Sequence, residues 1–169
     1  MLIRQETFSD HSEVYTLVQA AFAKAEHSDG SEQELVEALR KSPAFVPALS
    51  LVAQENEILK GYILFTEIKV GTKTALALAP LAVQPDFQRQ GIGSALVREG
   101  HRRAAALGYN CSVVLGSEHY YPRFGYVPAE ALGIQTPKGF PPASFMALFL
   151  RKGIHFSGGP VTYAPEFGL

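Results

Sequence analysis

The stretch QRQGIGSALV, residues 88–97, carries two glycines, Gly91 and Gly93, at the front of an apolar-periodic segment. Apolar residues recur from Ile92 onward at the spacing of one helix face. The first N–H groups of a helix lack partners, the helix dipole adds partial positive charge there, and glycine lets a ligand approach the backbone. The stretch therefore predicts a helix that begins near residue 92 and whose first turn can bind an anion such as a phosphate.

The residues on either side of this helix predict a mixed α/β order of elements. Periodicity and turn residues predict helices over about 10–24 and 31–41, and strands over 2–6, 49–53, 58–70, 74–83, 112–115, 126–127 and 144–150. The segment TALALAPLAV, residues 74–83, is apolar almost throughout, as expected of a central strand covered on both faces. Pro80 cannot donate a ladder hydrogen bond, so we expect a bulge or a local separation from a neighbouring strand there.

Composition limits the class of protein. The chain has 169 residues, with 15 basic and 16 acidic side chains and a formal net charge of −1. We expect one domain, 1–169, with an irregular tail from about residue 152. The charge balance gives no reason to expect a nucleic-acid partner, and no apolar run is long enough for a membrane partner. The start lacks a signal-peptide pattern and Cys111 is the only cysteine, so we expect a cytoplasmic monomer or homodimer.

The glycine turn has several alternative interpretations: three kinds of phosphate-binding site, or an ordinary helix start with no ligand. The P-loop pattern needs a lysine directly after its last glycine, and none follows Gly93, which excludes it. The dinucleotide fingerprint needs a third glycine where Leu96 stands, and antiparallel hairpins rather than a βαβ unit precede the turn. The remaining phosphate ligand is the diphosphate of coenzyme A, bound by the backbone amides of the turn.

Three segments together resemble one protein family. QRQGIG, residues 88–93, resembles the Gln/Arg-x-x-Gly-x-Gly/Ala signature of the GCN5-related N-acetyltransferases (GNAT). PLAVQPDFQ, residues 80–88, is similar to that family's central strand and the loop after it. YPRFGY, residues 121–126, resembles the family's Tyr-x-x-x-Gly-Phe segment. The combination resembles the predicted-acetyltransferase subgroup often called YhbS-like, and the likeness covers essentially the whole chain in element order.

The resemblance implies both a fold and an activity. The fold is a single-domain GNAT-like α/β fold, with a mixed, mostly antiparallel sheet, helices on both of its faces and a bulged central strand. The activity is the transfer of an acetyl group from acetyl-CoA, as co-substrate, to a primary amine by direct attack in a ternary complex. The implied partner is a small-molecule or peptide amine.

The resemblance also implies where acetyl-CoA binds. The amides of residues 88–94 would bind the diphosphate, and the edge of strand 81–83 would pair with the pantetheine arm. Ser117 lies where many relatives have an asparagine and is a possible substitute for it, and Arg123 would either reach the phosphates or cap a helix end. The predicted coenzyme-binding residues are Leu81, Ala82, Val83, Gln88, Arg89, Gln90, Gly91, Ile92, Gly93, Ser94, Ser117, Tyr120 and Arg123.

Tyr121 is the predicted catalytic acid. It lies four residues before Gly125, as the family's tyrosine lies before its glycine. A phenol can donate a proton to the leaving thiolate. Tyr120 is the competing residue, because a shift of one position in the loop would exchange the two, and core packing is the structural alternative for either ring.

The base that takes a proton from the amine is not apparent from the sequence. The central strand 74–83 has no carboxylate, although some relatives use a glutamate there. Glu67, Glu118 and His119 remain as candidates, each with solvated surface as its alternative. A backbone amide near Val83 would bind the carbonyl oxygen as it gains charge.

The other polar residues predict no second chemistry. Cys111 begins an apolar run and is expected to be a buried, inert thiol. The five histidines show no metal-ligand spacing, so no metal is expected. There is no Gly-x-Ser-x-Gly elbow for a serine hydrolase. The segment His101-Arg102-Arg103 is expected on the solvated face of its helix.

The acceptor is the part of the function that the sequence leaves open. In this fold the first two helices and the segment after Tyr126 would form the acceptor pocket. Acidic residues in that region have two alternative roles: to attract a cationic amine, or to serve as helix caps and solvated surface. These residues are Glu26, Asp29, Glu32 and Glu34. Two further functions stay open, a CoA-binding sensor without turnover and transfer of another acyl group such as succinyl or propionyl.

Overall fold

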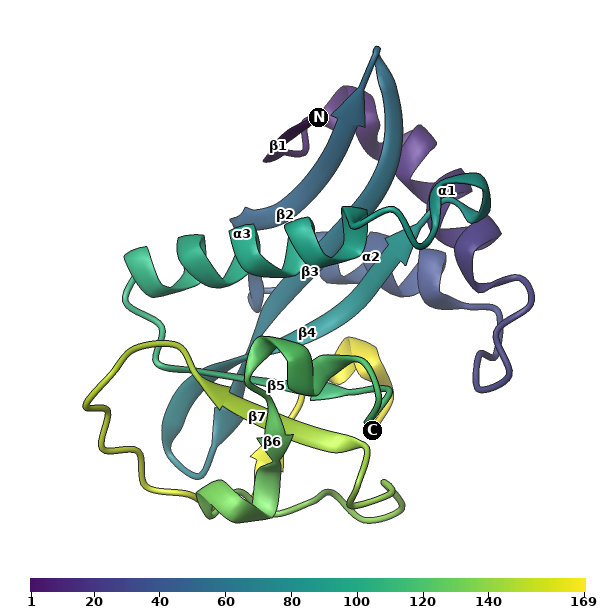
Figure 1. Ribbon diagram of the computed structural model, residues 1–169. Coiled ribbons are helices and arrows are strands. Elements are labelled where there is room, and N and C mark those ends of the chain that lie inside the picture. The colour runs from purple at the N-terminus through teal and green to yellow at the C-terminus, as the bar shows by residue number, and fades with distance from the viewer.

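The fold consists of one eight-stranded sheet with helices on both faces, and the computed structural model describes residues 1–169 (Figure 1). The strands are β1 (Leu2–Gln5), β2 (Phe45–Glu55), β3 (Ile58–Val70), β4 (Lys73–Val83), β5 (Cys111–Leu115), β6 (Val127–Pro128), β7 (Phe145–Phe149) and β8 (Val161–Thr162). The helices are α1 (His11–Phe22), α2 (Glu32–Arg40) and α3 (Ile92–Ala106).

The sheet has the order β1-β2-β3-β4-β5-β7-β6, and β8 pairs with β3. Only β4 and β5 are parallel; all other neighbours are antiparallel. The predicted mixed, mostly antiparallel sheet is therefore confirmed. Strand β2 begins at Phe45, ahead of the predicted Leu49, and a register shift between Phe45 and Ser50 accommodates Pro47, which cannot donate to a ladder.

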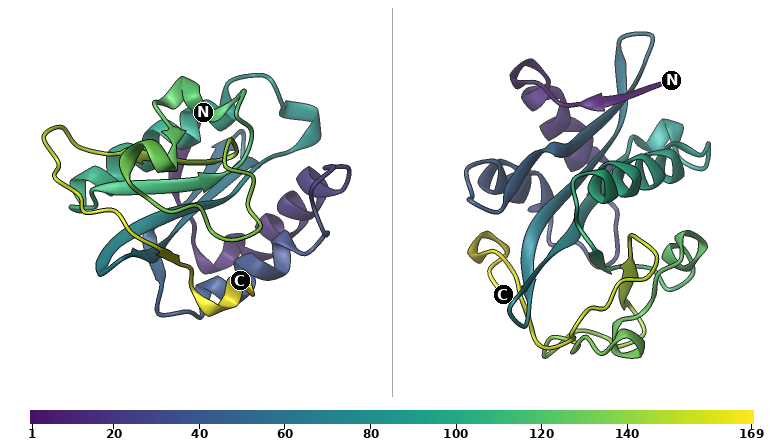
Figure 2. Two further views of the ribbon diagram at one scale, coloured as in Figure 1. Left: turned by 90° about the horizontal axis from the view of Figure 1, so that it is seen from below. Right: turned by 90° about the vertical axis from the view of Figure 1, so that its left-hand side faces the viewer.

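The two faces of the sheet carry separate cores. Helices α1 and α2 lie on one face and α3 on the other, as the two views in Figure 2 show. On the first face, Leu17 and Leu39 belong to a buried cluster with Tyr62 of β3. On the second face, Leu96 of α3 belongs to a cluster with Phe65 of β3. The alternation of side chains along β3 thus supplies both cores from a single strand.

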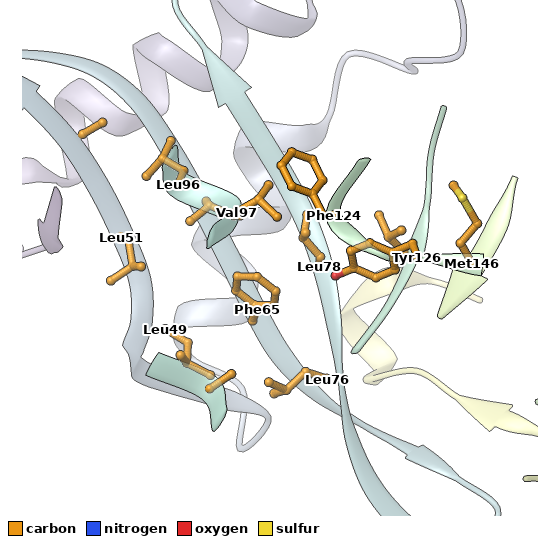
Figure 3. Packing of buried hydrophobic residues seen from close by; sticks show 14 of the residues in the cluster. Leu49, Leu51, Phe65, Leu76, Leu78, Leu96, Val97, Phe124, Tyr126 and Met146 are labelled. Carbon is orange, nitrogen blue, oxygen red and sulfur yellow. The ribbon is translucent and has the colours of Figure 1, made fainter. Parts of the chain in front are cut away.

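Helix α3 approaches the sheet closely because of Gly100. A Cβ atom at this position would lie well inside contact distance of the Phe65 ring, which is fully buried. Figure 3 shows Leu96 and Val97 of the same helix beside the strand residues Leu51 and Phe65. The missing side chain therefore fixes the depth at which α3, and the glycine turn in front of it, lies on the sheet.

We expect Gly100→Ala to destabilise the protein by about 1 kcal/mol. Alanine raises helix propensity by about 1 kcal/mol, but overpacking against a fixed ring costs about 1–3 kcal/mol, so packing decides the sign. The free energy of unfolding from urea titration measures the effect. Ala106→Gly, at an exposed position of the same helix, reports propensity alone. A stabilised Gly100→Ala protein would contradict the packing argument.

Strand β4 separates from β5 after a short pairing. The two strands pair at Leu76 and Ala77 only, and in Figure 1 the carboxyl end of β4 rises away from β5. On its other side β4 stays paired with β3, but the register shifts between Leu78 and Leu81, around Pro80. The irregularity predicted at Pro80 is thus confirmed, and the sheet has an open fork between β4 and β5.

The expectation that His101 lies on a solvated helix face is wrong. Its ring is largely buried between Phe65 and Tyr126, with centroid distances of 5.9 and 5.4 Å. Nε2 lies 2.8 Å from the Tyr126 hydroxyl, which is also 2.8 Å from Ser112 Oγ. Burial, with a smaller effect of Arg98, lowers the pKa of His101 to about 4. Arg102 does face the solvent.

Stability should therefore fall between pH 6.5 and pH 4. In the unfolded chain His101 takes up a proton near its ordinary pKa of 6.5, whereas in the fold it does so near 4. The unfolded state binds more protons in this range, so the free energy of unfolding decreases by up to about 1.4 kcal/mol per pH unit as the pH is lowered. Urea titrations across this range should give a smaller slope for His101→Phe, and the wild-type slope for the exposed control His155→Gln. Equal slopes in all three proteins would refute the assignment to His101.

The tail from Lys152 is only partly irregular. Within it, Val161 and Thr162 form β8, which pairs with Lys69 and Val70 of β3. After it, the rings of Tyr163 and Phe167 pack against each other at 5.1 Å, beside the cores. None of the helices has the length and apolar character that crossing a membrane would require.

Candidate functional site

The glycine turn ahead of α3 exposes a run of backbone N–H groups. Gly91 has φ +86°, a left-handed conformation that favours glycine, and Arg89 has φ +63°. No N–H group from Arg89 to Ser94 donates a hydrogen bond to any atom of the chain. The amide of Gln88, which was included in the predicted cradle, donates to the Pro85 carbonyl at 3.5 Å. The unpartnered groups therefore begin at Arg89 and end in the first turn of α3.

These groups border a cavity of about 540 Å³. The residues that line it are Leu81, Val83, Gln88, Arg89, Gly91, Ile92, Gly93, Ser94, Tyr120 and Arg123. All of them are among the predicted coenzyme-binding residues. Ala82, Gln90 and Ser117 were also predicted but do not line this cavity. The Ala82 side chain is buried in the core on the α1 and α2 face, and Ser117 lines a second cavity.

Gly93 leaves room for the Tyr120 hydroxyl. A Cβ atom at Gly93 would lie 2.8 Å from that oxygen, so the hydroxyl stands directly over the helix start. Arg123 is fixed beside it, because its guanidinium lies 4.5 Å from the Tyr120 ring centroid and its Nε donates to the Tyr120 carbonyl at 3.0 Å. The cavity therefore combines free N–H groups, two guanidinium groups and the hydroxyl-bearing residues Ser94 and Tyr120, with no carboxylate among its lining residues.

The edge of β4 that faces the fork carries free backbone groups. Gln84 donates its N–H to the Lys60 carbonyl of β3, whereas the Val83 carbonyl accepts from the Gln88 side chain at 3.1 Å. Successive residues of a strand direct their backbone groups to opposite edges. The N–H groups of Val83 and Leu81 therefore point away from β3, toward the side where β5 no longer pairs.

Tyr121 begins a short 3-10 turn, Tyr121–Phe124, and unlike Tyr120 it does not line the cavity at the glycine turn. Its ring lies against Gly116, in the place that a Cβ atom there would fill, and is perpendicular to the Tyr120 ring at 5.1 Å. Burial, and to a lesser degree Tyr120, raises the pKa of Tyr121. Its hydroxyl forms no hydrogen bond with another group of the chain. The hydroxyl is thus protonated at neutral pH and can donate a hydrogen bond.

A second cavity, of about 790 Å³, is lined in part by residues 116–119, which directly precede the two tyrosines in the chain. Three parts of the chain form it: the end of α1 with the connection to α2, the turn after β5, and the residues ahead of β7. Its lining residues are Phe22, Ala25, Glu26, His27, Ser28, Glu32, Leu115, Gly116, Ser117, Glu118, His119, Pro141 and Ser144. Three carboxylates and no lysine or arginine line it, the reverse of the first cavity.

The structure separates the candidate bases. Glu67 accepts a hydrogen bond from Tyr109 at 2.6 Å and lines neither cavity. Glu118 and His119 both line the second cavity, with 3.6 Å between the His119 Nε2 and a Glu118 carboxylate oxygen. His119 is 88% exposed, so it lies at the rim. Only these two candidates can therefore face a ligand in either cavity.

Of the four acidic residues expected near the acceptor pocket, the structure places two at the second cavity and two elsewhere. Glu26 and Glu32 line the second cavity. Asp29 instead accepts from Ser31, and Glu34 accepts from the Tyr15 hydroxyl at 2.8 Å. Sequence reasoning could not separate these pairs, and it missed Phe22, His27, Leu115 and Ser144, whose approach depends on the tertiary fold.

Cys111 is fully buried, and burial raises the pKa of its thiol to about 12. A thiol with that pKa carries almost no thiolate at neutral pH, which agrees with the inert role expected for it. No three side chains of the histidine, cysteine and acidic types come together as a group that could bind a metal ion.

The chain is similar to proteins with known family assignments. The family model described as "Acetyltransferase (GNAT) domain" matches residues 47–128. The uncharacterized N-acetyltransferase YjhQ of Escherichia coli K12 is 34% identical over 137 residues, which cover 79% of this chain and 70% of YjhQ. A GNAT family acetyltransferase from Brucella melitensis, solved with acetyl-CoA, has a TM-score of 0.83 and 32% identity, covering 98% of this chain and 97% of that one. The YhbS N-acetyltransferase of Escherichia coli, solved with CoA, has a TM-score of 0.86 and 28% identity, covering 99% and 92%.

Proposed function

Because this chain belongs to the GNAT family of acetyltransferases, we propose that it moves the acetyl group of acetyl-CoA directly to a primary amine in a ternary complex. Family membership makes the chain an acetyl-CoA-dependent N-acetyltransferase. The proposal adds the sites, the direct attack and the roles of individual residues. It takes the whole chain, 1–169, as one such domain.

The free N–H groups from Arg89 to Ser94 carry the proposal. A run of unpartnered amides at a helix start, with guanidinium groups beside it, binds a diphosphate through hydrogen bonds and charge. In this role Arg89 and Arg123 contact phosphate oxygens, and the Tyr120 hydroxyl donates to one of them. The pantetheine arm extends along the open edge of β4, where the N–H groups of Leu81 and Val83 have no acceptor in the chain and can donate to the arm.

The acetyl group then lies in the fork between β4 and β5, with the amine arriving from the second cavity. The amine nitrogen attacks the carbonyl carbon, a C–N bond forms, and the carbonyl oxygen gains negative charge that a backbone N–H near Val83 stabilises. The C–S bond breaks as this intermediate collapses, and the Tyr121 hydroxyl gives its proton to the leaving sulfur. The proton released by the amine passes to Glu118 or His119, directly or through water. Holding both reactants at one point supplies much of the rate.

The alternative of a CoA-binding sensor without turnover runs against the family assignment, and the exposure of the candidate bases is the one observation in its favour. Glu67 is occupied by Tyr109, and the remaining candidate bases, Glu118 and His119, are exposed at the rim of the second cavity. A protein that binds the coenzyme but never deprotonates an amine needs no better base. Turnover with any amine distinguishes the enzyme from the sensor.

Calorimetric titration with acetyl-CoA, CoA, NAD and ATP tests the proposal, followed by a thiol-release assay with a set of amines. We expect binding of acetyl-CoA and CoA, weaker or no binding of NAD and ATP, and free CoA release that depends on the amine. Propionyl-CoA and succinyl-CoA in the same assay define the acyl group. A folded protein that binds none of the CoA compounds would overturn the proposed cradle.

A further inference from the structure

The second cavity is lined by carboxylates that have few partners in the chain, so their negative charge is available to a ligand. Glu26 has no hydrogen-bond or ion-pair partner in the chain, and Glu118 faces only the His119 imidazole, at 3.6 Å. Glu32 differs, because it accepts a hydrogen bond from Ser28. No lysine or arginine lines this wall to compensate the three carboxylates. An anionic acceptor is therefore repelled here, and a cationic one is attracted.

The same wall offers an apolar strip. Phe22, Ala25, Leu115 and Pro141 line it, and Leu115 is 45% exposed although it is a large apolar side chain at the end of a strand. An apolar surface beside carboxylates suits a ligand with methylene groups next to a charge. Burial of such groups contributes about 0.8 kcal/mol for each CH₂.

The cavity also reaches the reacting centre. Gly116 and Ser117 line it, the Tyr121 ring lies against Gly116, and the Ser117 carbonyl accepts the N–H groups of both Tyr120 and Tyr121. The turn after β5 is thus shared by the cavity and by the tyrosine segment of the fork. A ligand amine held in the cavity lies beside the place proposed for the acetyl group.

From these observations we infer that the acceptor is a diamine or a longer polyamine, with a chain of methylene groups between its nitrogen atoms. The inference rests on the proposed function. The nitrogen that attacks must be neutral, so it cannot compensate the carboxylates. A second, distant ammonium group can, and it pairs with Glu26, while Glu118 stays available for the proton. The methylene groups between the two nitrogens lie on the strip that includes Phe22 and Leu115.

Three acceptors with the same six-carbon chain test the inference: 1,6-diaminohexane, n-hexylamine and 6-aminohexanoate. They differ only at the far end, which is an ammonium group, a methyl group or a carboxylate. With acetyl-CoA saturating, we expect kcat/KM to fall in that order, by about tenfold or more from first to last. Raising the salt concentration should narrow the difference, because exposed charges are screened.

The variant Glu26→Gln locates the effect without touching a candidate base. Exposed pairs of opposite charge contribute modestly, so we expect about a threefold rise in KM for the diamine. The KM for n-hexylamine and the affinity for acetyl-CoA should stay unchanged. Glu37→Gln is the matched control, an exposed and unpartnered glutamate of α2 outside the cavity.

The outcomes separate this inference from the proposed function. Absence of acetyl-CoA binding in calorimetry would refute the proposed function. If the protein binds acetyl-CoA but prefers n-hexylamine or 6-aminohexanoate as acceptor, only the inference of a diamine acceptor is refuted. The same holds if it acetylates none of the three amines. A Glu26→Gln variant with an unchanged KM for the diamine would also refute it, because this carboxylate would then not bind the distant charge.

Discussion

The variant Gly93→Glu should bind acetyl-CoA at least about 100-fold more weakly than the wild type. Its side chain starts 2.8 Å from the Tyr120 hydroxyl and brings a carboxylate into the cavity whose free N–H groups we assign to the diphosphate. Opposed like charges at a binding site cost several kcal/mol, and each 1.4 kcal/mol is a factor of ten in affinity. Calorimetric titration with acetyl-CoA measures the change directly.

The fold should survive this substitution. Gly93, unlike Gly91, does not have a positive φ, and an acidic side chain in the first turn of a helix is favoured by the helix dipole. Ala106→Glu places the same charge at the exposed, opposite end of α3 and should bind acetyl-CoA as the wild type does. A folded Gly93→Glu protein with wild-type affinity would exclude the diphosphate from the glycine turn.

The variant Tyr121→Phe should lower kcat by about 100-fold and leave acetyl-CoA affinity within about a factor of two, since a positioned acid contributes about 10²–10⁴ in rate. Phenylalanine keeps the ring that packs on Gly116 and removes only the hydroxyl, which has no partner in the chain. The fold therefore loses no internal hydrogen bond. Steady-state kinetics with a fixed amine, beside calorimetry, separate the rate from the binding.

Tyr120→Phe is the matched comparison, because the two rings are neighbours and lose the same atom. The Tyr120 hydroxyl stands over Gly93 in the first cavity, so its removal should weaken acetyl-CoA binding and change kcat little. The reverse result, a large loss of kcat in Tyr120→Phe and none in Tyr121→Phe, would exchange the roles of the two tyrosines.

The first cavity was largely predictable because its residues are close in sequence. The turn 88–94 and the strand end at Val83 are adjacent in the chain, and a glycine pattern encodes the turn itself. Ala82 was predicted to contact the coenzyme through the backbone edge that it shares with Leu81 and Val83. Alternate strand residues face opposite sides, so its side chain lies in the core on the α1 and α2 face.

The error at His101 also had a signal in the sequence. This residue follows Val97 by four positions and precedes the buried Ala104 by three, the spacing of one helix face. The prediction grouped His101 with its polar neighbours Arg102 and Arg103 and overlooked that its spacing places it on the buried face. A histidine on the buried face, bonded to Tyr126, becomes part of the core.

The second cavity had no local signal at all. Phe22, Leu115 and Ser144 belong to segments far apart in the chain, and only the fold brings them together. The sequence could place an acidic region near the first two helices, but Glu26 faces the cavity while Glu34 bonds to Tyr15. Side-chain direction after the end of a helix depends on tertiary contacts, which periodicity does not describe.

The fork between β4 and β5 has a consequence for solubility. Unpaired strand edges invite pairing with other chains, and proteins normally shield them with charge, proline or a covering segment. Here the free edge of β4 lies inside the sheet, with β5 and the Tyr120–Tyr121 segment beside it. This free edge is therefore not one of the outer edges of the sheet, at which a strand of another chain would add, and a ligand arm can reach its N–H groups. The protein thus presents free strand hydrogen-bonding groups to a small molecule at a place inside the sheet, away from the outer strands β1 and β6.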